Sequence, residues 1–277
     1  MFFVLFLACG EPVALVSDAA LVSDAALVSI AGEEAGDYGG WAAAGVGDVN
    51  GDGADDLLVG AFQANKLFPV VDGETSTATI VPFHLDEEAD EEIGSGVAYL
   101  FYGPLQSAMS LGDADAILMG EAASDTIGRS LSGEGDFDGD GRGDIAIGGM
   151  HLDYEGHDSG GVLLLLSAPT GSSSILDSAF TIEGDVATGH FGSALDAAGD
   201  VDGDGLDDLL VGAHLINQDE TTGRVTLLSG AHLSAAVAGV SMSVDELSPT
   251  HWTAEEEGDY LGRAVTGAGD VNGDGLA

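Results

Sequence analysis

One acidic, glycine-rich motif followed by an apolar run recurs along the chain and constrains its fold more than any other feature. The motif reads GDVNGDGADDLLVGA at residues 47–61, and full-length variants of it occupy residues 135–149 and 199–213. A shorter copy, GDVNGDGLA, ends the sequence at residues 269–277. Successive copies are 88, 64 and 70 residues apart. A spacing of this size indicates a repeat of whole supersecondary units.

Short apolar runs surround each acidic motif and predict strands. They are bounded by Gly, Asp and Ser, and no segment of comparable length has a helical period. Each unit is therefore predicted to hold about four strands, the content of one β-propeller blade. The predicted fold class is all-β, an incomplete propeller of four-stranded antiparallel sheets with about three blades and part of a fourth. The runs outside the motifs lie at 25–33, 96–104, 115–121, 161–169, 178–184 and 223–231.

The acidic loops have the donor pattern of a calcium site. Each complete loop has an oxygen-bearing side chain at positions 1, 3, 5 and 9, a glycine at position 6 and a free backbone carbonyl at position 7. Six or seven oxygens suit calcium, whereas magnesium prefers a rigid octahedron and keeps its waters. The loops contain no thiolate or imidazole, which argues against zinc or copper there. The predicted ligands are Asp48, Asn50, Asp52, Ala54 and Asp56; Asp136, Asp138, Asp140, Arg142 and Asp144; Asp200, Asp202, Asp204, Leu206 and Asp208; and Asp270, Asn272 and Asp274.

Of these residues, Ala54, Arg142 and Leu206 are expected to bind through their carbonyl oxygens, giving about three complete calcium sites and a truncated fourth. The EF-hand shares this first half but requires a glutamate at position 12 and a following helix. Here position 12 is Val59, Ile147 or Val211, and a strand signal follows. A metal-free, solvated acidic turn remains the alternative.

The chain resembles the FG-GAP repeats of the integrin α-subunit β-propeller and their bacterial relatives over roughly residues 25–277. The resemblance rests on the acidic loops, on the Phe191-Gly192 pair and on three degenerate GAP-like ends that lack the family's proline. It implies that each loop joins adjacent strands of one blade and holds structural calcium at the rim. The GAP-like ends are Gly60-Ala61-Phe62, Gly148-Gly149-Met150 and Gly212-Ala213-His214.

The repeat spacing divides the propeller region into units, which we expect at about 25–112, 113–177, 178–239 and, in part, 240–277. A propeller closes with about 4–8 blades, so the sequence is expected to be a fragment whose last unit exposes an apolar face. Residues 62–95 form an insertion in the first unit, either a loop on a binding face or a solvated loop.

Charge excludes one class of partner. The net charge is −44, from 5 Lys and Arg residues and 49 Asp and Glu residues. Nucleic acid is excluded because phosphate contacts need basic side chains, and adsorption to anionic lipid is disfavoured. The acidity fits either saline surroundings or general solubility.

The N-terminus predicts export. Residues 2–8 are apolar, and the stretch that ends in Ala8-Cys9-Gly10 resembles a bacterial lipobox with Cys9 as the lipidated residue, so residues 1–9 are predicted to be an export signal. A short apolar stub with a free cysteine is the alternative. Residues 10–24 then form a linker that contains most of a duplicated LVSDAA hexad. The expected location is the cell surface or outer membrane, as a lipoprotein, or the medium, and contact with a membrane is expected only through Cys9.

No catalytic motif stands out in the sequence. The segment HLDYEGHD at 151–158 is either a polar loop or a site for a metal or a proton. The predicted function is an extracellular calcium-binding module that binds an unidentified protein or polysaccharide, with structural calcium in its loops. The alternative is the non-catalytic scaffold of a larger secreted enzyme, such as a lyase or phospholipase.

Overall fold

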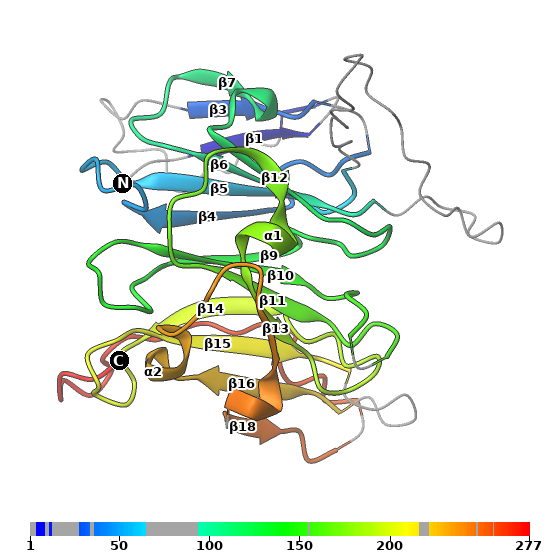
Figure 1. Ribbon diagram of the computed structural model, residues 1–277, viewed down its shortest axis with the longest axis vertical. Coiled ribbons are helices and arrows are strands. Elements are labelled where there is room, and N and C mark those ends of the chain that lie inside the picture. Colours follow the sequence, from blue (N-terminus) through cyan, green and yellow to red (C-terminus); the bar gives the residue numbers. More distant parts are fainter. Residues whose placement is uncertain are drawn as a thin grey trace.

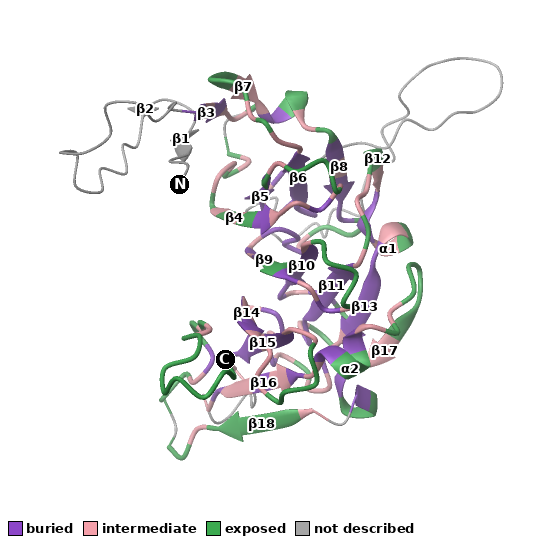
Figure 2. Ribbon diagram, turned by 90° about the vertical axis from the view of Figure 1, so that its left-hand side faces the viewer, coloured by how far each residue is buried: buried purple, intermediate pink, exposed green. Residues whose placement is uncertain are grey.

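The computed structural model describes residues 4–8, 11–12, 28–33, 36–64, 94–154, 156–215, 222–247, 249–256 and 258–277. These residues form four β-sheets joined by loops and short helical turns. The sheets follow one another along the long axis of the molecule in sequence order (Figure 1). Viewed from the side, they fan out as an open arc (Figure 2). The fold is therefore all-β, a partial β-propeller, as predicted.

Three of the sheets are blades with the same antiparallel order, and the fourth is a smaller sheet at the N-terminal end. The first blade contains β4 (Ala42–Gly47), β5 (Asp56–Ala61), β6 (Val97–Phe101) and β8 (Ala116–Met119). The second contains β9 (Ser130–Gly135), β10 (Asp144–Gly149), β11 (Gly161–Leu165) and β13 (Phe180–Glu183). The third contains β14 (Ala194–Gly199), β15 (Asp208–Ala213), β16 (Arg224–Leu228) and β18 (Thr250–Thr253). The N-terminal sheet contains β1 (Val4–Ala8), β2 (Glu11–Pro12), β3 (Val28–Ala31) and β7 (Ala108–Ser110).

A short parallel strand from the next repeat extends the outer edge of each preceding sheet. The strand β12 (Gly171–Ser174) pairs with β8, and β17 (Ser241–Ser243) pairs with β13. In the same way β7 pairs with β3 of the N-terminal sheet. The sequence predicted only four antiparallel strands per sheet, because these added strands are polar and short. They tie successive sheets together through backbone hydrogen bonds.

The sheet pairing also sets the phase of the repeat. The repeat spacing places the run at 115–121 in the predicted unit 113–177, together with the acidic loop that follows it. In the structure its strand, β8, pairs with β6 and so belongs to the blade of the preceding loop. A periodic sequence has no intrinsic starting point, so spacing alone does not show which of two neighbouring sheets such a run joins.

The cores lie between the sheets, which explains why the strand after each loop is apolar throughout. In β5, Leu57 and Val59 pack toward Val28 of the N-terminal sheet, whereas Leu58 packs toward Ile145 of the second blade. A strand buried on both faces cannot alternate apolar and polar residues. The inner strands β4, β9 and β14 contact one another in turn and line the inside of the arc.

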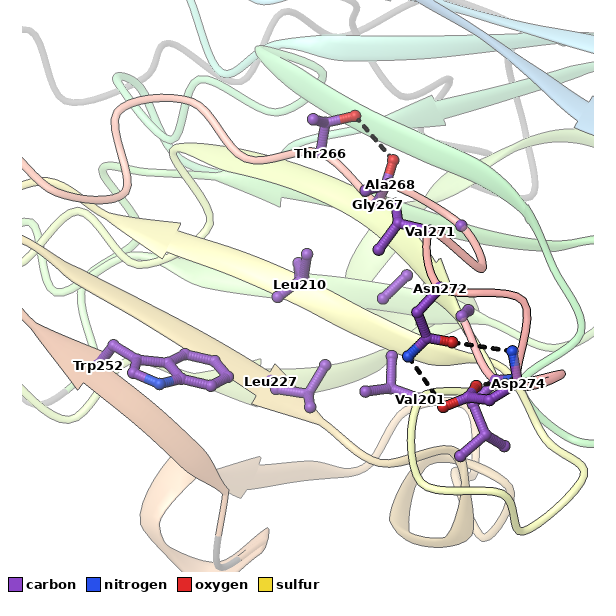
Figure 3. Close-up of a pocket in the computed structure, with 14 residues that line it drawn as sticks. Val201, Leu210, Leu227, Trp252, Thr266, Gly267, Ala268, Val271, Asn272 and Asp274 are labelled. Carbon is purple, nitrogen blue, oxygen red and sulfur yellow. Dashed lines mark hydrogen bonds between the residues drawn. The ribbon is translucent and has the colours of Figure 1, made fainter.

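The outward face of the third blade is partly open to solvent. Leu210, Leu227 and Trp252 line a cavity of about 420 Å³ together with the segment that carries Val271 and Asn272 (Figure 3). Trp252 is 51% exposed and Val271 is 81% exposed. An exposed apolar surface of this kind is the feature that the sequence predicted for the last unit.

Three predicted features lie wholly or mostly outside the described residues. These are Cys9, the linker at 10–24, of which only residues 11–12 are described, and the insertion, of which residues 65–93 are not described. The lipid anchor and the role of the insertion therefore stay predictions. Among the described residues no helix has the length and apolar character needed to cross a bilayer.

Candidate metal centre

Each complete acidic loop connects the innermost strand of a blade to the next strand, as the hairpin between β4 and β5, β9 and β10, or β14 and β15. A register shift occurs at the end of each of these hairpins, for example between Ala197 and Gly199. The loops therefore leave the sheet at a bulge, where the backbone is free to turn around an ion.

The first aspartate of each loop folds the backbone around its carboxylate. In the first loop Asp48 accepts hydrogen bonds from the backbone N–H groups of Gly51, Asp52 and Gly53, at 2.7, 2.9 and 2.8 Å. Gly53 has φ of 90°, which a residue with a side chain rarely adopts. The loop is thus curled with its position-1 carboxylate at the centre.

The same arrangement recurs in the other loops. Asp200 accepts from Gly203, Asp204 and Gly205 at 2.7, 3.1 and 3.0 Å. In the second loop Asp136 accepts from Gly141 at 2.9 Å. The shorter fourth loop repeats the pattern, since Asp270 accepts from Gly273, Asp274 and Gly275 at 2.6, 3.2 and 2.8 Å.

The position-9 aspartates are buried and join each loop to its blade. Asp56, Asp144 and Asp208 are 3%, 2% and 0% exposed. One oxygen of each accepts the backbone N–H of loop position 2, at 3.0, 2.7 and 2.9 Å. The second oxygen of Asp56 accepts the backbone N–H of Gly103, which follows β6, and the second oxygen of Asp208 accepts that of Gly230, which follows β16.

Burial makes these carboxylates difficult to ionise. Burial, together with repulsion from Asp138, Asp136 and Asp140, raises the pKa of Asp144 to about 7 despite the opposing hydrogen bond from the backbone of Phe137. Burial likewise raises the pKa of Asp56 and of Asp208. A bound cation would favour the ionised carboxylates and relieve this repulsion.

In two of the loops the structure brings the predicted side-chain donors together. The carboxylate oxygens of positions 1, 3 and 9 lie within 4.8 Å of one another in the second loop and in the third. The position-5 carboxylates of Asp52, Asp140 and Asp204 are exposed, and each accepts the backbone N–H of position 7 at 2.9 Å. All-oxygen donor sets of this kind fit a hard divalent cation.

Neighbouring loops are also bonded to each other, which the sequence did not predict. The backbone N–H of Asp207, at position 8, donates to the carbonyl oxygen of Asp136 in the preceding loop at 3.1 Å. A carboxylate oxygen of Asp207 accepts the N–H of Asp136 in return, at 2.9 Å. Ala277 donates to the carbonyl of Asp200 in the same way, at 3.0 Å. The second, third and fourth loops are therefore linked in sequence by hydrogen bonds.

This repeated geometry has a counterpart among known proteins. The FG-GAP repeat family model matches residues 39–80 and 191–228, which contain the first and third acidic loops. The chain contains FG-GAP repeats in these two stretches. Its fold is accordingly a partial propeller of FG-GAP blades.

The FG-GAP region is homologous to integrin α subunits. It is 34% identical over 195 residues to integrin alpha-IIb of Homo sapiens, 31% over 197 residues to integrin alpha-PS2 of Drosophila melanogaster, and 28% over 236 residues to integrin alpha-5 of Xenopus laevis. These alignments cover 68%, 68% and 83% of this chain, but 16%, 12% and 19% of the relatives. The chain therefore spans less than a fifth of the length of these curated relatives.

The glycines of the FG-GAP motifs meet between blades. In the second blade the N–H of Gly128, in the FG-like turn, donates to the carbonyl of Gly148, in the GAP-like end, at 3.3 Å. A Cβ on Gly148 would overlap the carbonyl oxygen of Gly192, the FG glycine of the next blade. Gly60 meets Gly128, and Gly212 meets Gly262, in the same manner. The motif therefore needs glycine because two backbones touch at each blade junction.

A second group of polar residues in the FG-GAP propeller lies at the junction of the second and third blades. His151 and Asp158, from the loop between β10 and β11, are joined by a contact of 2.9 Å between Nδ1 and Oδ1. The ring of His190, from the FG-like turn before β14, is centred 4.8 Å from that of His151 and 5.1 Å from that of His214. The sequence flagged the segment 151–158 but gave no sign that His190 joins it.

Burial lowers the pKa of His190 to about 4, with His151 and His214 adding to the effect. Burial also lowers the pKa of His214, followed by repulsion from Arg263 and Arg129. The imidazole of His190 is therefore unprotonated at neutral pH.

A third candidate surface surrounds Arg129. Its guanidinium carbon lies 5.4 Å from the ring centres of both Trp41 and Phe62. Tyr38 and Trp41 are 51% and 53% exposed. Arg129 also borders a cavity of about 390 Å³ that Arg263, His214 and Tyr260 line. This aromatic group (Tyr38, Trp41 and Phe62) was not predicted from the sequence.

Proposed function

We propose that the chain is an extracellular calcium-binding module whose acidic loops hold structural calcium. The observation that carries the proposal is the repeated loop geometry, in which the backbone curls around the position-1 aspartate while a buried position-9 aspartate closes the loop. The oxygen-only donors suit calcium better than zinc or copper. Three complete sites, and a fourth lacking its position-9 carboxylate, are expected.

Calcium would act on the fold as well as on the loops. The position-9 aspartates fasten each loop to its blade, so an ion bound to them fixes the hairpin and its register. Metal binding energy then adds to the free energy of unfolding. The concentrations that matter are those typical of extracellular calcium modules, about 10⁻⁴–10⁻³ M.

The decisive experiment is calorimetric titration of the chelator-treated chain with calcium. About three ions should bind, and Asp204→Ala should remove one site while leaving the other complete loops able to bind. Glu255→Ala, which removes an exposed carboxylate outside the loops, is the matched control and should bind as the unmodified chain does. Absence of calcium uptake at millimolar concentration would contradict the proposal. Loss of the same number of calcium sites in Asp204→Ala and Glu255→Ala would also contradict it.

We further propose that the module binds a protein or polysaccharide ligand, as an adhesion module does, through the surface around Arg129. Exposed aromatic residues and arginine are enriched among residues that dominate binding energy, and Tyr38, Trp41 and Arg129 supply both. Trp41→Ala should abolish capture of the chain on ligand-bearing surfaces, whereas Trp252→Ala should not. Equal capture of both variants would place the binding surface elsewhere.

The location outside the cell is also part of this proposal. It is supported by the homology to integrin α subunits and by the apolar start of the sequence. If Cys9 is an anchor, labelled palmitate should enter the chain in a bacterial host and should fail to enter Cys9→Ser. Equal labelling of the two would leave secretion without an anchor.

A further inference from the structure

We propose that His151, Asp158 and His190 bind a divalent transition-metal ion, with zinc the best match, at the junction of the second and third blades. One donor atom from each residue lies within 4.8 Å of the other two. Two of the residues come from the loop between β10 and β11, and His190 comes from the turn before β14. The site is separate from the acidic loops and uses different donor chemistry.

The backbone holds these three residues in place. The N–H of Asp158 donates to the carboxylate of Asp153 at 2.6 Å, and Asp158 has φ of 55°. The N–H of His190 donates to the carbonyl of Asp158 at 3.2 Å, and His190 has φ of 56°. A left-handed backbone is uncommon for residues with side chains, so two such residues side by side indicate a conformation that the surroundings impose. Tyr38, Thr126 and Tyr260 have φ of 54°, 56° and 48° at the equivalent positions of the other repeats, so the repeat itself fixes the backbone that carries His190.

One ring nitrogen at the site has no partner among the described residues. The Nδ1 atom of His190 is buried and makes no hydrogen bond. A buried polar atom without a partner costs about 1–3 kcal/mol, which a metal bond would recover. The Nδ1 atom of His151 faces a carboxylate oxygen of Asp158 at 2.9 Å, so these two donors lie on the same side of the site and an ion could contact both.

The donor set favours a transition metal over calcium. Imidazole and carboxylate ligands together suit zinc, which binds nitrogen at about 2.0–2.1 Å in a tetrahedral shell. His157 and Asp153 lie beside the site, since their donor atoms and one of Asp158 are also within 4.8 Å of one another. His157 is exposed and can rotate toward the ion to complete the shell.

His214 is not included in the proposed shell, although its ring is next to that of His190. It lines the cavity that also holds Arg129 and Arg263, and two guanidinium groups repel a cation. The proposed ion therefore lies on the Asp158 side of His190. Bound there, it would link the loop of one blade to the turn of the next.

The experiment is zinc titration of the full chain in saturating calcium and excess magnesium, which occupy sites for hard cations on this acidic surface. One zinc ion per chain should bind. His190→Gln and His151→Gln should each weaken zinc binding at least tenfold, whereas His232→Gln, an exposed histidine on α2 (Gly230–Leu233), should have no effect. Calcium titration of each variant shows that the blades remain folded.

Cobalt supplies a second readout that a merely structural role would not produce. Cobalt bound by histidine and carboxylate in a tetrahedral shell gives intense visible absorption, which His190→Gln should remove. No zinc uptake, or equal zinc affinity in His190→Gln, His151→Gln and the control, would overturn the proposal.

Discussion

Asp144 combines deep burial with three nearby carboxylates, so its ionisation should respond strongly to a bound cation. Without an ion its pKa of about 7 lies well above the ordinary value of 3.8. In the unfolded chain the group ionises near the ordinary value. The folded state therefore binds more protons than the unfolded state between these two pH values, and stability falls as pH rises across this interval.

This difference gives a pH prediction for the metal-free chain. The free energy of unfolding should decrease as pH rises from about 4 to about 7, because the folded state loses the proton that it holds on Asp144. Each unit of difference between the folded and unfolded pKa corresponds to about 1.4 kcal/mol. Calcium stabilises the ionised carboxylates, so the stabilisation by calcium should grow over the same interval. Urea unfolding at several pH values, with calcium and with chelator, measures both trends.

Asp144→Asn is the matched variant, since it keeps the shape and loses the charge. It should reduce, without abolishing, the pH dependence of the metal-free chain, because Asp125 also has a pKa raised to about 7, and it should weaken calcium binding in the second loop. The idea fails if the free energy of unfolding depends more steeply on pH in Asp144→Asn than in the unmodified chain. It also fails if calcium stabilises the unmodified chain equally at pH 4 and pH 7.

At the scale of elements, the blades pack through glycine contacts rather than through side chains alone. Gly148→Ala would place a methyl group onto the carbonyl of Gly192 and the hydroxyl of Ser130. Overpacking of this kind costs about 1–3 kcal/mol, and here the obstacle is partly backbone, which cannot rotate away. Thermal unfolding should therefore begin at a lower temperature in Gly148→Ala.

Gly45→Ala is the control for this prediction. Gly45 also lies in a strand, but a methyl group there would meet only the flexible side chain of Glu134 at 3.2 Å. Its melting temperature should stay close to that of the unmodified chain. Similar destabilisation in the two variants would indicate a general loss from placing alanine in a strand.

The strands next to the acidic loops were predictable because both signals are local. A buried strand such as β10 is a continuous apolar run, and the loop before it has a fixed register of oxygen donors and glycine. The parallel strand β12 was not predictable, because its sequence GSSS has no apolar pattern and its partner precedes it by about 55 residues. The contact between His190 and the 151–158 loop is likewise set by the packing of two blades, which no local pattern encodes.

At the scale of the whole molecule, the open face of the third blade leaves large apolar side chains exposed. Trp252 lies on β18, the edge strand of the last sheet, and borders the same cavity as Leu210 and Leu227 (Figure 3). Exposed edges and apolar faces favour association. Sedimentation velocity should therefore show self-association that increases with protein concentration.

Trp252→Gln should reduce this association. Trp41→Gln removes a tryptophan of almost equal exposure from another surface and serves as the control. A monomer at every concentration, or equal association of the two variants, would show that the third-blade face does not drive it.

The hydrogen bonds between neighbouring loops have a consequence for how the chain takes up calcium. Ordering the third loop fixes Asp207, and Asp207 in turn holds the backbone of Asp136 at the start of the second loop. Filling either loop should therefore raise the affinity of the other by the same factor, since such coupling is reciprocal.

The first loop lacks this carboxylate link because position 8 of the second loop is Gly143. Calcium binding should thus be cooperative for one pair of sites, with a Hill coefficient above one, and independent for the site at Asp48. Asp207→Ala removes no predicted ligand and keeps the backbone bond to Asp136, yet loss of its carboxylate should weaken the coupling, so that the Hill coefficient falls toward one and the two loops respond to calcium over a wider range of concentration.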